Sequence, residues 1–294
     1  MREFRQMKMT FWGVRGSFPV TAPLQLGYGG NTPCLEVEAN GQTVIIDAGT
    51  GIRALGRAIV DRGQREIDIL LSHTHWDHIQ GFPHFDPLYR DNTRITVHSL
   101  KHEGRSLAKI FREQQRSPFF PVSLDDVKAD VQFVEHEDGE TFCVGSIAVT
   151  SRRLNHPGVA GGYRLEHGNS AVAYVCDVDL YGPLLLAHEL PASSTDDLRL
   201  EELRNRARDL AHRADWVVCD TFFLADEYVP DWGHSSIDDG LQLAREVDAH
   251  GLLLFHHRPG RDDTELDSLQ RRYRDEAGGK FDVLASKEGL EISL

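Results

Sequence analysis

The stretch Leu70-Leu71-Ser72-His73-Thr74-His75-Trp76-Asp77-His78 decides the fold of this chain. It places four strong metal ligands in the pattern H-x-H-x-D-H. The residues that lead into it, Ile67–Ser72, form a short aliphatic run bounded by polar residues, which predicts a buried strand. The ligands therefore begin where a strand is expected to end, and loops at such ends often carry function.

The spacing of these four ligands indicates more than one metal ion. His73 and His75 are two residues apart, so in an extended chain their side chains point to the same side. Asp77 and His78 follow, where the chain is expected to enter a helix. Three imidazoles and a carboxylate are more than one tetrahedral zinc needs from a single segment. We therefore expect two metals here, rather than a surface loop with chance histidines.

Composition excludes several classes of protein. The 294 residues include 46 acidic and 32 basic ones, a net charge of −14, which opposes nonspecific binding to nucleic acid and to anionic membranes. No stretch approaches the roughly 20 apolar residues of a membrane span, and Met1–Arg5 lacks the apolar core of a secretory signal. The four cysteines are scattered without a C-x-x-C pair, which favours reduced thiols. We expect a cytoplasmic protein with a single domain, residues 1–294, because no segment resembles a linker.

Strand-like and helix-like segments follow one another in a similar order in both halves of the chain. The expected strands are Lys8–Val14, Cys34–Ala39, Gln42–Asp47, Ile67–Ser72, Arg94–His98, Val131–Glu135, Glu140–Val144, Ile147–Arg153, Gly162–Glu166, Ala171–Cys176, Trp216–Cys219, Leu252–Phe255, Phe281–Leu284 and Leu290–Ile292. The expected helices are Ile52–Asp61, Glu103–Gln115, Asp197–Arg213, Ser236–Ala249 and Asp262–Glu276. Asn40-Gly41 predicts a tight hairpin, because both residues tolerate positive φ. The order predicts an α/β fold of two packed sheets with helices outside, a four-layer αββα sandwich.

Three later residues can complete a site for two metals. His156, Asp177 and His256 each follow an expected strand, and a carboxylate such as Asp177 can bridge two cations. A single His or Asp at a strand end is more often a cap or a turn residue, so the combination with the first motif is what makes them candidates. His257 competes with His256, which we prefer because it comes first after the strand.

With these positions the chain resembles the metallo-β-lactamase fold superfamily of metal hydrolases over nearly its whole length. The resemblance implies an αββα sandwich with a dinuclear centre at one edge. It implies one metal on His73, His75 and His156, a second on Asp77, His78 and His256, and a bridging Asp177. Histidine and carboxylate ligands suit two divalent ions, zinc in the first place, with manganese or iron as alternatives.

Finer features resemble the branch that contains ribonuclease Z and the cyclic phosphodiesterases. They are Asn155-His156-Pro157-Gly158 followed by Gly162-Tyr163-Arg164, the stretch Tyr28-Gly29-Gly30-Asn31-Thr32-Pro33-Cys34, and Trp232-Gly233-His234-Ser235-Ser236. The last resembles an H-S-T element that ribonuclease Z places beside its metals, which implies an acid–base role for His234. The alternative is that His234 only precedes a helix that Ser235 or Ser236 caps.

The resulting expectation is a metal-dependent phosphodiesterase that acts on a small phosphodiester such as a cyclic nucleotide. Its expected catalytic residues are Asp77 and His234. Six arginines could hold phosphate: Arg15, Arg53, Arg153, Arg164, Arg258 and Arg261. Arg15 and Arg258 are preferred because they lie beside motif loops, and arginine suits bidentate phosphate contacts.

Other functions stay open. One is a different hydrolase on the same fold, such as a lactonase or a β-lactamase, because a fold does not decide the chemistry. A second is an RNA-processing nuclease, which the charge and the lack of a Gly/Pro-rich RNA-gripping arm oppose. A third is a non-catalytic metal-binding sensor. We also expect a homodimer, with the aromatic loop Pro118-Phe119-Phe120-Pro121 as a buried patch.

Overall fold

The structure is a computed structural model that describes residues 7–102, 104–185 and 196–294. The first residues of the chain, on which the expectation about a secretory signal was based, lie outside the described ranges. Glu103, the expected start of a helix, lies outside them as well. No helix among the described residues is long and apolar enough to cross a membrane.

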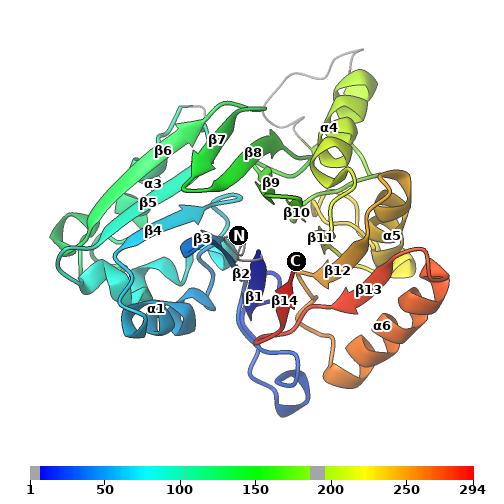
Figure 1. Cartoon of the computed structure of the whole chain (residues 1–294), viewed down its shortest axis with the longest axis horizontal. Coiled ribbons are helices and arrows are strands. Elements are labelled where there is room, and N and C mark those ends of the chain that lie inside the picture. Colours follow the sequence, from blue (N-terminus) through cyan, green and yellow to red (C-terminus); the bar gives the residue numbers. More distant parts are fainter. Residues whose placement is uncertain (1–6, 103, 186–195) are drawn as a thin grey trace, which may run out of the picture.

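Two seven-stranded sheets lie at the centre of the protein (Figure 1). The first sheet has the order β14 (Glu291–Ser293), β1 (Lys8–Gly13), β2 (Cys34–Ala39), β3 (Gln42–Ile46), β4 (Glu66–Leu70), β5 (Arg94–Leu100) and β6 (Asp130–His136). The second has the order β13 (Asp282–Ala285), β12 (Gly251–Phe255), β11 (Trp216–Asp220), β10 (Ser170–Val175), β9 (Gly161–His167), β8 (Ile147–Arg153) and β7 (Thr141–Val144).

Helices cover the outer face of each sheet. In Figure 1, α1 (Ile52–Asp61) and α3 (Leu107–Gln114) lie on the side of the first sheet, and α4 (Asp196–Ala211), α5 (Ile237–Glu246) and α6 (Asp263–Ala277) on the side of the second. A one-turn helix, α2 (Trp76–Ile79), carries the end of the histidine motif. Short 3₁₀ helices are η1 (Pro23–Gln25), η2 (Phe82–His84), η3 (Asp86–Tyr89), η4 (Leu124–Asp126) and η6 (Ala225–Glu227).

Three apolar layers hold these elements together. Between the sheets, residues such as Val37 and Val44 of the first sheet pack in one cluster with Leu253 of the second. A second cluster joins the first sheet to α1 and α3, and a third joins the second sheet to α4, α5 and α6. The four-layer αββα sandwich expected from the sequence is therefore confirmed.

Strand β12 shows how the sequence pattern follows from this burial. Leu252 and Leu254 pack under the outer helices, whereas Leu253 and Phe255 face the first sheet. Because both faces of the strand are covered, its sequence is a continuous apolar run rather than an alternation. The hairpin prediction is also confirmed, since Asn40 has φ 50° and Gly41 φ 81° between paired strands β2 and β3.

The direction of the strands determines where function can lie. Strands β3 to β6 are mutually parallel, as are β10 to β13. Strand β8 is antiparallel to β9, which is antiparallel to β10, so β8 runs in the direction of β10. The carboxyl ends of parallel strands meet at one edge of a sheet, where ligands commonly bind in α/β folds.

Helix ends differ from expectation where a cap intervenes. The helix expected over Ser236–Ala249 begins at Ile237, because the Ser236 hydroxyl accepts the backbone N–H of Asp239 and so acts as the N-cap. The helix expected to begin at Glu103 begins at Leu107, after an extended Ser106.

Leu253→Ala should lower the free energy of unfolding by about 2–5 kcal/mol, because it opens a cavity between the two sheets. Leu253 is fully buried there. Leu198→Ala is the matched control, since Leu198 of α4 is 72% exposed and should give a change within about 0.5 kcal/mol. Urea denaturation measures both, and equal effects would contradict the assigned core.

Candidate metal centre

The structure brings all seven expected ligands to one place. They form two groups, and within each group the ligand atoms lie within 4.8 Å of one another. The first group is His73, His75, His156 and Asp177, and the second is Asp77, His78, Asp177 and His256. These are the two sets that the family resemblance implies, with Asp177 in both. Most members are buried, whereas His75 is exposed and opens the site to solvent.

Asp177 lies between the two groups and turns one carboxylate oxygen to each. Its Oδ2 is 3.4 Å from His73 Nε2 and 3.7 Å from His156 Nε2. Its Oδ1 is 3.3 Å from His78 Nε2 and 3.2 Å from His256 Nε2. A carboxylate oriented in this way can contact one cation on each side.

Asp77 completes the second group. Its Oδ2 lies 3.2 Å from His256 Nε2 and 3.4 Å from His78 Nε2. The same oxygen accepts the backbone N–H of Ser17 at 2.8 Å, which fixes the carboxylate from the opposite side.

Buried nitrogens without partners test whether the residues fit a metal. His73 Nε2 and His78 Nε2 are buried, and neither makes a hydrogen bond to any described residue. A buried polar atom left unsatisfied costs about 1–3 kcal/mol, so such atoms are rarely left unpaired. Both atoms point at Asp177, and a divalent cation on each side of that carboxylate would satisfy them. The donor set of imidazoles and carboxylates therefore fits two such ions.

The other ring nitrogens of these histidines are held by the protein. His78 Nδ1 donates to Asp47 Oδ2 at 2.8 Å, and His156 Nδ1 donates to the Gly233 carbonyl at 2.7 Å. His73 Nδ1 lies 3.1 Å from Ser72 Oγ. With Nδ1 as the donor, the lone pair of each Nε2 faces the centre, as a metal ligand requires.

Asp47 belongs to the candidate site, and the sequence reasoning missed it. It is fully buried and also accepts hydrogen bonds from the Tyr174 hydroxyl at 2.7 Å and from the backbone N–H of Ser72 at 2.7 Å. The same signal that pointed to His256 was present, namely a polar residue directly after an apolar strand, since Asp47 directly follows β3. From the sequence, it is expected only as the last residue of the strand Gln42–Asp47.

The charge states of Asp177 and His156 suit metal binding. Burial alone raises the pKa of Asp177, but the neighbouring imidazoles of His256 and His78 override it and hold this pKa well below the usual range. Burial lowers the pKa of His156 to about 3. The bridging position is thus occupied by a carboxylate and the His156 position by a neutral imidazole, which are the forms that bind metals.

His234 lies beside both groups. Its ring centroid is 5.6 Å from that of His156 and 5.1 Å from that of His256. Its Nδ1 is 2.8 Å from Asp220 Oδ2, and the ring stacks on Phe222. Burial alone lowers the pKa of His234, but the buried Asp220 carboxylate overrides it and raises this pKa to about 9. Asp220, the last residue of β11, was also missed by the sequence reasoning.

A third possible ligand group contains Asp177, Asp220, His234 and His256. In that group His234 and Asp220 are already hydrogen-bonded to each other. The two main groups also contain close pairs, His75 Nδ1 with His156 Nε2 at 3.1 Å and Asp77 Oδ2 with His256 Nε2 at 3.2 Å. Each main group, however, also has a buried Nε2 without a partner among the described residues, that of His73 in one and that of His78 in the other. The two main groups are therefore the better candidates.

The structure changes the prediction for Arg15 and decides between His256 and His257. Arg15 was expected to hold phosphate, but its guanidinium is fully buried and donates to the carbonyls of Gly29, Gln25 and Arg261. It therefore joins loops rather than binding a substrate. His257 is excluded as the ligand, because its Nε2 donates to the Ser286 carbonyl at 2.8 Å.

Arg258, the other expected phosphate contact, is partly exposed and lies 3.3 Å from Glu227. Its guanidinium also lies over the Phe223 ring, 5.9 Å from the centroid. It is thus accessible but already has a carboxylate partner.

Comparison with known proteins places the chain in a family. A family model described as a beta-lactamase superfamily domain matches residues 42–257, a range that contains all seven candidate ligands. The chain belongs to this superfamily. A ribonuclease Z from Archaeoglobus fulgidus is 24% identical over 284 residues, which cover 85% of this chain and 86% of that protein.

Solved structures show the same fold. The metallo-beta-lactamase fold protein YhfI from Bacillus subtilis superposes with a TM-score of 0.69 and 17% identity, over 99% of this chain and 100% of that one. A diphosphatase from the PhnP family superposes with a TM-score of 0.65 and 15% identity, over 98% of each chain. The expected membership of the metallo-β-lactamase fold superfamily is confirmed, and at these identities the structural likeness shows the fold alone.

Asp177→Ala should release both metals, because one carboxylate serves the two groups of ligands. We expect the zinc-loaded wild-type protein to retain close to two ions per chain after dialysis, and the variant to retain few. Asp226→Ala, at an exposed aspartate, is the control. Elemental analysis measures the content, and a variant that keeps both ions would show that Asp177 is only a turn residue.

Asp47→Asn should weaken metal binding about 10- to 100-fold, the typical effect of changing a carboxylate that supports a ligating histidine. The amide can still accept one hydrogen bond but no longer supplies negative charge to His78. Competition with a chromogenic chelator measures the affinity, with Asp226→Asn as control. Unchanged affinity in a folded variant would refute the supporting role of Asp47.

Proposed function

We propose that this protein is a dinuclear metal-dependent phosphodiesterase that hydrolyses a small phosphodiester, such as a cyclic nucleotide, with zinc as the first candidate metal. The observation that carries the proposal is Asp177, with one oxygen toward each ligand group and the His234–Asp220 pair beside them. A ribonuclease and a diphosphatase among the proteins that this chain resembles support chemistry at phosphorus.

In this proposal His73, His75 and His156 hold one ion, Asp77, His78 and His256 the other, and Asp177 contacts both. When bound, the two ions would supply an acidified water and neutralise charge on the phosphoryl oxygens. Asp77 contributes to catalysis by helping to hold the second ion. The backbone N–H of Ser17 donates to its carboxylate and keeps it in position.

His234 is the proposed general acid. Asp220 accepts the hydrogen bond from Nδ1, so the ring is oriented with Nε2 free to donate. A cavity of about 480 Å³ is lined by both His234 and Asp177, which brings a bound phosphodiester within reach of both. As the P–O bond breaks, the Nε2 proton passes to the leaving alkoxide. Arg258 remains a proposed contact to phosphate.

The size and charge of the site favour a small substrate. A cavity of about 480 Å³ lies within the usual range for small-molecule sites, roughly 300–1,000 Å³. The net charge of −14 opposes a large RNA. RNA processing is nevertheless the second candidate, because the ribonuclease Z relative covers most of the chain.

Two further parts of the proposal concern the protein's state. We place it in the cytoplasm, which the four free cysteines support. We also propose a homodimer.

The direct test is a screen of zinc- or manganese-loaded protein against cyclic mononucleotides, cyclic dinucleotides, bis(p-nitrophenyl) phosphate, a transfer RNA precursor, a lactone and a β-lactam. We expect turnover of small phosphodiesters. Turnover of the lactone or β-lactam alone would replace the proposal with the corresponding hydrolase, and turnover of the RNA alone would favour the second candidate. No turnover by fully loaded protein would favour a binding role.

His234→Ala should lower hydrolysis of a cyclic nucleotide about 10²- to 10⁴-fold, because an alkyl alkoxide leaves poorly unless it is protonated. Hydrolysis of bis(p-nitrophenyl) phosphate should fall much less, since p-nitrophenolate needs no proton to leave. Both ions should stay bound. The measurement is the ratio of the two rate losses.

The control for this prediction is His250→Ala, which removes an exposed histidine that also pairs with an aspartate, Asp215. It should leave both rates unchanged. Equal losses on the two substrates in His234→Ala would instead indicate a role in positioning phosphate.

A further inference from the structure

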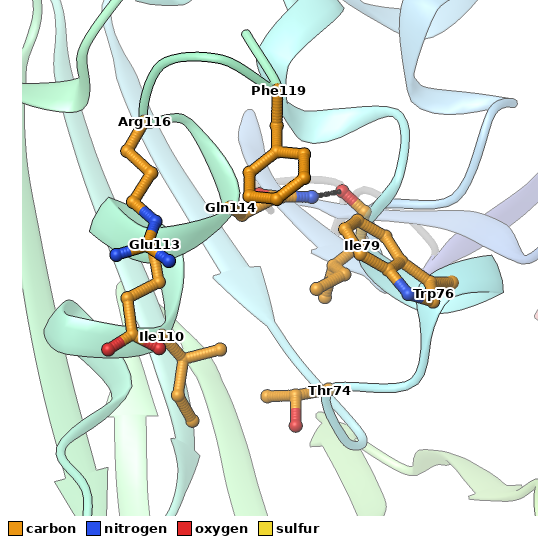
Figure 2. Close-up of a pocket in the computed structure, with 8 residues that line it drawn as sticks. All are labelled: Thr74, Trp76, Ile79, Ile110, Glu113, Gln114, Arg116 and Phe119. Carbon is orange, nitrogen blue, oxygen red and sulfur yellow. Dashed lines mark hydrogen bonds between the residues drawn. The ribbon is translucent and has the colours of Figure 1, made fainter.

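A second cavity, of about 360 Å³, adjoins the proposed metal centre. We call it the aromatic cleft. In Figure 2, residues of α3 line one side, Trp76 lies on the other and Phe119 lies at the upper end. Its lining residues are Thr74, Trp76, Ile79, Ile110, Glu113, Gln114, Arg116 and Phe119. Its volume falls in the range of small-molecule sites.

Two large aromatic side chains line this cleft without being buried. Trp76 is 65% exposed and Phe119 is 71% exposed. Ile79 and Ile110 add apolar surface at its sides. Exposed rings that face a cavity next to a reactive centre are what a flat, aromatic ligand requires, because rings stack favourably on one another.

The cleft also contains polar groups without protein partners. Gln114 Nε2 donates to the Ile79 carbonyl at 2.7 Å, which fixes the amide (Figure 2). Its Oε1 is buried and has no hydrogen-bond partner among the described residues. A ligand that donates an N–H would satisfy this acceptor.

Arg116 adds a positive charge at the same cleft. It is exposed, and it forms no ion pair within the described part of the chain. In a protein of net charge −14, a cation without a carboxylate partner beside the reactive centre suits a ligand that carries negative charge.

The cleft is continuous with the metal centre. Thr74 and Trp76 line both this cavity and the one that contains Asp177 and His234. These two residues flank His75, so a molecule bound at the candidate metal centre lies next to the cleft.

From these contacts we propose that the aromatic cleft binds the nucleobase of a nucleotide phosphodiester, with Phe119 and Trp76 as the stacking residues. This rests on the proposed phosphodiesterase function and adds the residues that would bind the base. The preferred base carries an amino group, as adenine does, which donates to Gln114 Oε1. The phosphodiester then lies at the metal centre.

The test compares substrates that share a leaving group. Adenosine 5′-(p-nitrophenyl phosphate) carries a base, and methyl p-nitrophenyl phosphate does not; water cleaves each to release p-nitrophenol. Phe119→Ala should lower kcat/KM for the adenosine ester about 5- to 150-fold, the effect of losing one base–aromatic stack. The methyl ester should be unaffected, because Phe119 touches none of the candidate ligands.

Two controls sharpen this test. Leu198→Ala removes an exposed apolar side chain from α4 and should change neither rate. Purine riboside 5′-(p-nitrophenyl phosphate) lacks the amino group and should react about 3- to 10-fold more slowly than the adenosine ester. Equal losses on adenosine and methyl esters in Phe119→Ala, or no loss on either, would overturn the proposal.

A binding measurement tests this inference independently of the proposed catalytic function. If the loaded protein cleaves no phosphodiester, calorimetry with adenosine 5′-monophosphate still tests the cleft. Binding by the wild type that Phe119→Ala weakens supports a base site, and no binding by the wild type overturns it. Light scattering tests whether a second copy of the chain occupies the cleft instead. A wild-type dimer that Phe119→Ala dissociates would show that it does.

Discussion

The position of the Asp177 carboxylate between two sets of imidazoles is the constraint on which the site depends. Each of its oxygens lies 3.2–3.7 Å from histidine nitrogens that come from both sheets. Two of these nitrogens, His73 Nε2 and His78 Nε2, have no hydrogen-bond partner among the described residues, and cations beside the carboxylate would satisfy them. The sheets must therefore pack accurately, since the ligands of each group come from both.

Backbone strain at the site follows from the same constraint. Asp47, Asp177 and His256 all have positive φ, at 63°, 52° and 60°. Such left-handed conformations cost of order 1–3 kcal/mol each for residues other than glycine, and they persist only where the surroundings impose them. Here each strained residue follows an inner strand, and the packed strands hold the turn that points its side chain at the centre.

The sequence predicts the fold, and the clustering of the candidate ligands, because both depend on local patterns. Apolar runs that end in His or Asp mark strands and strand ends, and their periodicity does not depend on distant contacts. The role of Arg15 could not be predicted in this way, because its partners are backbone carbonyls such as that of Arg261, far along the chain. Asp47 and Asp220 carry the strand-end signal, but only the fold shows that each lies against a histidine.

The candidate metal centre and the aromatic cleft are built from different parts of this protein. The candidate ligands come from the ends of packed strands in both sheets, whereas the aromatic cleft is built by α2, α3 and the loop that follows α3. Only Thr74 and Trp76 belong to both regions. Phe119 is in neither candidate ligand group among the described residues, so its substitution is expected to leave the ligands in place. Under the proposals above, substrate preference could vary through surface loops while the candidate ligands stay unchanged.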